Sequence, residues 1–146
     1  MPTAKQVGDY LVTLAHREGD PITHLKLQKL CYYVQGFSLA IRDKPMFPET
    51  IQAWDHGPVV PALFQQHKQH GNQVIPRPDR TTIAEVSVKD RELIQEVYKV
   101  YGQFSGWRLR DMTHTEPPWK NVFVEGVPFI EITLDAMKAY FKTQLT

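Results

Sequence analysis

The segment 23–41 constrains the fold most, because it is apolar on nearly every side when drawn as a helix. Thr23, two residues after Pro21, can cap its N-terminus. Such a helix cannot leave a wide face in water, so other elements must cover it from several directions. One stripe carries Leu27, Leu30, Cys31, Val34, Phe37 and Ile41, and the other sides carry Leu25, Tyr32, Leu39 and Ala40. We therefore expect this helix to lie at the centre of the core.

Helices that could cover it are predicted on both sides along the chain. The first begins after Thr3, whose spacing to Gln6 is typical of a capping box, and Gly19 can end it in a left-handed conformation. Apolar residues also recur at three- and four-residue steps over 88–104. Three shorter helices are also expected. One covers 61–70, one starts at Ser105 and is ended by Pro117 and Pro118, and one follows Thr133.

Two short segments have the alternating pattern of half-buried strands, ETIQAW at 49–54 and TIAEVS at 82–87. We expect them to pair. A chain of 146 residues fits one domain with one core. The predicted fold is therefore mainly α: a compact single domain over residues 1–146, with about six helices around the central helix 23–41 and two or three very short β-strands.

Charge and cysteine content narrow the classes of function. The formal net charge is +1, so the chain has no broad basic field of the kind that binds nucleic acid phosphates. Cys31 is the single cysteine, and the N-terminus lacks the long apolar region of a secretory signal. No run of about 18 apolar residues occurs, which argues against a membrane span. We expect a cytoplasmic protein that does not bind nucleic acid directly.

Three side-chain sets could carry chemistry, and none has convincing spacing. His24 and Cys31 lie two helical turns apart, roughly 10 Å, too far to share a proton. His67 and His70 lack a third metal ligand at linked spacing, and we expect both to be exposed. Ser105, Asp111 and His114 are not accompanied by a nucleophile elbow, and Ser105 is better placed as a helix cap. We expect no catalytic residue, metal or cofactor.

The stretch AWDHGPVVP at 53–61 joins two apolar segments and concentrates unusual residues. Pro58 and Pro61 each remove a backbone donor, which disfavours an anion cradle, and they stiffen the chain. We interpret it as a rigid corner between a strand and a helix that starts near Pro61. Trp54, like Trp119 in THTEPPW, is expected to be mainly buried, whereas His56, His114 and Glu116 are candidates for the surface.

Three motifs together resemble a known family. ITHLKLQKLCYYVQGFSLA (22–40), AWDHGPVVPALF (53–64) and LRDMTHTEPPW (109–119) occur in the order and spacing of the Panacea-domain family, the SocA-like and GepA-like proteins of bacteria, their phages and other mobile elements. The last motif has Met112 where leucine is usual, a substitution that keeps size and apolarity. The resemblance extends over almost the whole chain.

The resemblance implies a non-enzymatic antitoxin that neutralises a protein toxin, usually encoded by the adjacent gene, by direct binding. Two alternatives remain open: a proteolytic adaptor that delivers the toxin to a protease, and an enzyme that acts on a small molecule near His56 and His114. Each signature residue could support the fold or contact the toxin. By position, these residues are Lys26, Lys29, Tyr32, Tyr33, Trp54, His56, Gly57, Pro58, Thr113, His114, Glu116 and Trp119.

Overall fold

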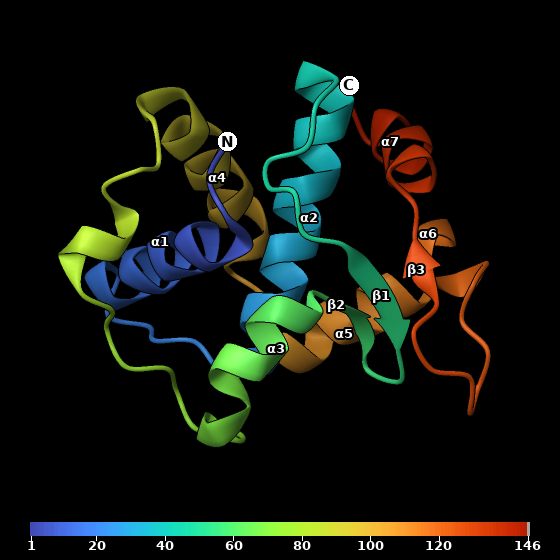
Figure 1. Ribbon diagram of the computed structural model, residues 1–146, viewed down its shortest axis with the longest axis horizontal. Helices are drawn as coiled ribbons and strands as arrows, with labels where there is room; N and C mark the ends of the chain where they lie inside the picture. Colours follow the sequence, from blue (N-terminus) through green and yellow to red (C-terminus); the bar gives the residue numbers. More distant parts are fainter. Residues whose placement is uncertain (146) are drawn as a thin grey trace.

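The computed structural model describes residues 1–145 and confirms a mainly α fold built around the predicted central helix. Helix α2 runs through the middle of the molecule and contacts α1, α4, α5 and α7, which surround it (Figure 1). The helices are α1 (Ala4–Arg17), α2 (His24–Arg42), α3 (Pro61–His67), α4 (Val88–Tyr101), α5 (Gly106–His114), α6 (Pro117–Lys120) and α7 (Leu134–Lys142), with 3₁₀ turns η1 (Lys68–His70) and η2 (Arg80–Ile83).

The ends of α2 and the approach of α7 follow from single residues. Thr23 accepts a hydrogen bond from the Lys26 backbone N–H, and Asp43 ends the helix in the left-handed conformation (φ 59°). Gly36 lies where α7 packs on α2. A Cβ atom at this position would lie 2.1 Å from Phe141 Cε2, so only glycine lets the Phe141 ring sit this close to the helix backbone.

The predicted caps of the other long helices are also confirmed. The Thr3 hydroxyl and the Gln6 side chain form the reciprocal capping box of α1. Ser87, Ser105 and Thr133 each accept a backbone N–H at the start of α4, α5 and α7. No helix within residues 1–145 is both long and apolar enough to cross a membrane.

A three-stranded antiparallel sheet, in the order β2-β1-β3, lies beside α2 and α5 (Figure 1). Strands β1 (Ile51–Trp54) and β2 (Gly57–Val59) form a hairpin with Asp55 and His56 in the turn, and β3 (Glu131–Ile132) pairs with the other edge of β1. The positive φ falls on Gly57 (105°), directly after the two turn residues. The predicted rigid corner is therefore a hairpin followed by α3, which starts at Pro61 as expected.

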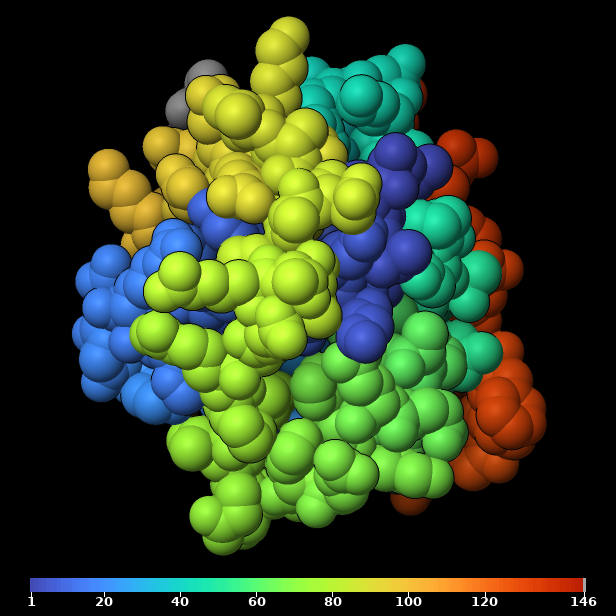
Figure 2. Space-filling view, turned by 60° about the vertical axis from the view of Figure 1, so that its left-hand side comes forward, coloured from blue at the N-terminus to red at the C-terminus, as the bar shows by residue number. Residues whose placement is uncertain are grey.

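Two predictions about local structure are wrong. Residues 82–87 form no strand, because Asp79 caps the 3₁₀ turn η2 through the Thr81 N–H and this segment lies across α1 (Figure 2). The partners of β1 are instead its own chain neighbour and a distant segment. The second concerns Pro117 and Pro118, which were expected to end the helix that starts after Ser105. That helix, α5, already ends at His114, and the two prolines occupy the first turn of α6, where a missing N–H is harmless.

Candidate binding site

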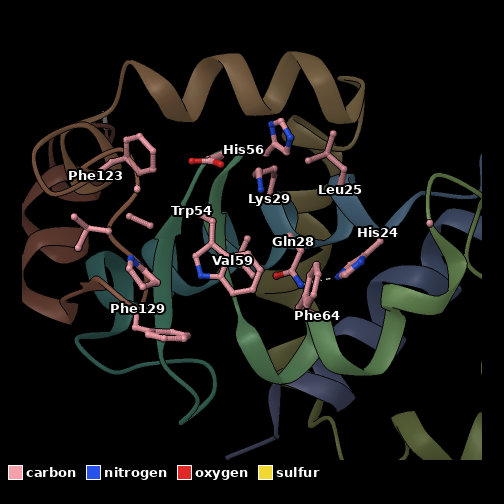
Figure 3. Close-up of a pocket in the computed structure, with 16 residues that line it drawn as sticks. His24, Leu25, Gln28, Lys29, Trp54, His56, Val59, Phe64, Phe123 and Phe129 are labelled. Atoms are coloured by element: carbon pink, nitrogen blue, oxygen red, sulfur yellow. Dashed lines mark hydrogen bonds between the residues drawn. The ribbon is translucent and has the colours of Figure 1, made fainter.

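An open pocket of about 710 Å³ lies between the start of α2, the β1–β2 hairpin, α3 and the loop 123–129 (Figure 3). Its walls are mainly apolar and include four large aromatic side chains: Trp54 stands in the middle, Phe64 lies on the side of α2 and α3, and Phe123 and Phe129 lie on the side of the loop. A pocket of this size and apolar character can hold a small molecule or several side chains of another protein.

The α2 wall of the pocket is fixed by the side chain of Gln28. Its Oε1 accepts the Val60 backbone N–H at 2.7 Å, so its amide nitrogen faces His24 and donates to Nε2 at 2.8 Å. Neutral His24 therefore carries its proton on Nδ1. Burial, with a smaller contribution from nearby His67, lowers the pKa of His24 to about 4, so the ring is neutral at pH 7.

Lys29 ties α2 to the hairpin from within the protein. The side chain is fully buried, and its Nζ donates to the Pro58 carbonyl at 3.0 Å. Burial lowers the Lys29 pKa to about 7, with a smaller contribution from the positive charge of Arg110. A Cβ at Gly57 would lie 2.8 Å from Lys29 Cε and 2.7 Å from Thr113 Oγ1. Lys29, Gly57, Pro58 and Thr113 thus form one tightly packed unit.

Lys26 makes a similar connection on another side of α2. It is buried, and its Nζ donates to the Gly102 carbonyl at 2.6 Å, at the end of α4. That carbonyl has no partner in a continuing helix, and the ammonium also complements the negative end of the α4 dipole. Lys26 therefore fixes α4 against α2 and does not reach the pocket.

Glu116 is buried, which contradicts its expected place on the surface. Tyr32 donates to Oε1 at 3.0 Å and Tyr33 donates to Oε2 at 2.8 Å, so the carboxyl is satisfied inside the protein. Burial raises the pKa of Glu116 to about 7, although both tyrosine hydrogen bonds lower it. Burial, together with the Glu116 charge, raises the pKa of both tyrosines. This buried network joins α2 to the start of α6.

The two tryptophans have different surroundings. Trp119 is buried as predicted, donates from Nε1 to the Trp54 carbonyl at 2.8 Å, and stacks on His114 with 3.9 Å between ring centroids. His114 is consequently half-buried and not fully on the surface. Trp54 is only half-buried, because its indole forms the centre of the pocket (Figure 3).

His56 is exposed at the rim of the pocket, as predicted. Arg110 on α5 donates from Nε to His56 Nδ1 at 3.2 Å, which leaves the proton of the neutral ring on Nε2. The His56 ring also meets the exposed Trp107 edge to face, with 5.4 Å between centroids. Trp107 and Arg110 thus extend the site onto α5.

The structure does not assemble the other candidate chemical groups into a site. Cys31 is buried, and burial raises its pKa. His67 was predicted to be exposed but is buried, and neither of its ring nitrogens has a hydrogen-bond partner. Its ring lies beside those of His24 and the half-buried His70. Within residues 1–145, no group of three His, Cys, Asp or Glu side chains could hold a metal ion. Ser105 is a helix cap, as expected.

Sequence reasoning missed several residues of the pocket. From the sequence, Phe64 is noted only as part of the motif 53–64 and no role is expected for the loop 123–129, yet both line the pocket. The available signal was the presence of Phe123, Val124, Val127 and Phe129 in a segment that also contains Gly126 and Pro128. Apolar residues in a loop without helical or strand periodicity have no local element to bury them, and three of these four are exposed.

Comparison with known proteins places this chain in a family. Residues 27–120, more than half of the chain, match the model of the family described as antitoxin SocA-like, Panacea domain. Over 72 residues the chain is 32% identical to Antitoxin SocA of Caulobacter vibrioides, an alignment that covers 49% of this chain and 38% of that relative. No solved structure matches. The chain belongs to the SocA-like antitoxin family with a Panacea domain.

Proposed function

We propose that this protein is an antitoxin that neutralises a protein toxin by direct binding, and that the pocket face is the contact surface. The family match carries the proposal, supported by a relative that is itself named an antitoxin. The matched segment 27–120 includes Gln28 and Lys29 of the α2 wall, the hairpin and α3, so just over half of the lining residues belong to it, whereas His24, Leu25 and the loop 123–129 lie outside.

The burial of the signature residues supports a division of roles. The buried ones make contacts inside the protein, and we assign them to holding the fold: Lys26, Lys29, Tyr32, Tyr33, Gly57, Pro58, Thr113, Glu116 and Trp119. Trp54 and His56 reach the pocket and solvent, so they are the signature side chains that can touch a partner directly. His114 is half-buried and stacks on Trp119, so we assign it to neither group.

Co-expression with the neighbouring open reading frame tests the proposal. We expect that the neighbour alone arrests growth, that this chain restores growth, and that the two proteins co-purify. His56→Ala and Trp54→Ala should weaken co-purification while the proteins stay folded by circular dichroism. A neighbour that is harmless alone, or a chain that neither restores growth nor binds it, would contradict the proposal.

The same assay separates direct neutralisation from the two alternatives. If the chain acts as an adaptor, toxin levels fall in its presence and rescue disappears in a protease-deficient host. If it acts as an enzyme, rescue persists at far less than one copy per toxin. Direct neutralisation predicts unchanged toxin levels and rescue that requires stoichiometric amounts.

A further inference from the structure

Phe129 combines two features that the fold alone does not explain. Its side chain is 75% exposed, and its backbone has φ of 63°, a left-handed conformation that bulky L-residues rarely adopt. The chain gains little from burying the ring and bears the strain of the backbone. Backbone strain of this kind is found mainly at binding and active sites, where the surrounding structure maintains it. Figure 3 places Phe129 on the opposite side of Trp54 from His24 and Lys29.

Two polar side chains of the pocket, His24 and His56, retain a free hydrogen-bond donor. His24 has its proton on Nδ1 because Gln28 donates to Nε2, and His56 has its proton on Nε2 because Arg110 donates to Nδ1. Lys29 adds no free donor, because its side chain is fully buried and its Nζ already donates to the Pro58 carbonyl. Asp55, exposed on the rim, is the single carboxylate among the described lining residues.

These observations define the chemistry of the occupant. The ring of Phe129 and the indole of Trp54 offer apolar area on one side, and the donors of His24 and His56 lie on the other. We propose that the pocket receives a segment of the toxin in which a large apolar side chain stands next to a carboxylate, with Phe129 closing over the apolar part. This proposal rests on the proposed antitoxin function and names the part of the partner that the site recognises.

The first test uses Phe129→Asn with Val88→Asn as a matched control. Asparagine tolerates the left-handed conformation, so the melting temperature of Phe129→Asn should stay equal or rise by a few degrees. Its affinity for the co-expressed toxin should fall at least about tenfold, as when an aromatic anchor is removed from an interface. Val88 is 71% exposed at the start of α4, away from the pocket, and its variant should bind normally.

If both variants bind the toxin as the original chain does, the pocket proposal is wrong while the antitoxin function stands. If the original chain fails to neutralise its neighbour, the antitoxin function is wrong, and a second measurement that needs no toxin decides about the pocket. That measurement titrates the isotope-labelled protein with N-acetyl-L-phenylalanine and with its uncharged amide, followed by NMR.

We expect the acid to shift signals of pocket residues, with those of Trp54 and His24 among them, and to bind several-fold more tightly than the amide. The Phe129→Asn variant should lose most of this response. Equal binding of acid and amide would overturn the requirement for a carboxylate, and shifts scattered outside the pocket would overturn the site itself.

Discussion

At the scale of single residues, the signature motif 53–61 shows how one glycine can be indispensable beside an exposed and replaceable neighbour. Gly57 has φ of 105°, and the space where a Cβ would project is already filled by Thr113 Oγ1 and Lys29 Cε. His56, one residue earlier, is exposed and bonded only to Arg110. Gly57 is therefore required by the fold, whereas the His56 side chain is available to contact a partner.

Gly57→Ala is expected to lower the free energy of unfolding by about 1–2 kcal/mol through backbone strain. The overlap of the new Cβ with Lys29 adds to this loss. His56→Ala should change it by less than about 0.5 kcal/mol, as substitutions at exposed sites usually do. Thermal and urea unfolding of both variants provides the measurement. A larger loss for His56→Ala would show that the ring supports the hairpin.

At the scale of elements, the docking of α7 on α2 depends on a smooth patch of helix at Gly36. Phe141 packs over this glycine and meets Tyr32, Tyr33 and Phe37 edge to face, at centroid distances of 5.3, 5.9 and 4.9 Å. The most buried part of α2 is therefore covered by the last helix of the chain. Helix propensity would favour alanine over glycine in the middle of α2, so packing has overridden it.

Gly36→Ala should destabilise the protein by about 1–3 kcal/mol or more, because the new Cβ overlaps the Phe141 ring. Gly8→Ala is the matched control, since Gly8 also lies within a helix but its Cβ would meet only flexible side-chain ends, Leu63 Cδ2 at 3.2 Å and Leu27 Cδ2 at 3.7 Å. Its gain in helix propensity, about 1 kcal/mol, should offset that contact. Equal losses for the two variants in thermal unfolding would contradict the role given to Gly36.

At the scale of the whole molecule, two buried groups give the stability opposite dependences on pH. The pKa of His24 is lowered from 6.5 to about 4, so the unfolded chain binds the extra proton and stability is lost as pH falls through this range. The pKa of Glu116 is raised from 4.5 to about 7, so the unfolded chain ionises first and stability is lost as pH rises through this range. Between pH 4.5 and 6.5 the two effects partly cancel.

Glu116→Gln removes one of these opposing contributions. Its stability relative to the original protein should rise between pH 4.5 and 7, by roughly 3 kcal/mol across the full range at 1.36 kcal/mol per pKa unit. Any constant penalty from the altered hydrogen bonds to Tyr32 and Tyr33 shifts the whole curve and leaves its slope unchanged. Urea unfolding from pH 4.5 to 7.5 measures the difference, and a difference that does not vary with pH would disprove a buried, protonated Glu116.

By itself the sequence determined every described α-helix except the short α6, the side-chain caps of the longer helices, and the family. Thr3, Thr23, Ser87, Ser105 and Thr133 cap helices because the groups that they bond lie three residues away, within the reach of a local pattern. The central position of α2 also follows locally, since a helix that is apolar on nearly every side has to be enclosed.

Only the tertiary structure decided which polar residues are buried and where the pocket lies. Glu116 was expected on the surface, yet the tyrosines that donate hydrogen bonds to it lie 83 and 84 residues earlier in the chain. Strand β1 likewise pairs with a segment about 80 residues later. The pocket likewise combines α2, the hairpin, α3 and the loop that holds Phe129. Burial and cavities depend on which distant segments meet, and that information is absent from the spacing of neighbouring residues.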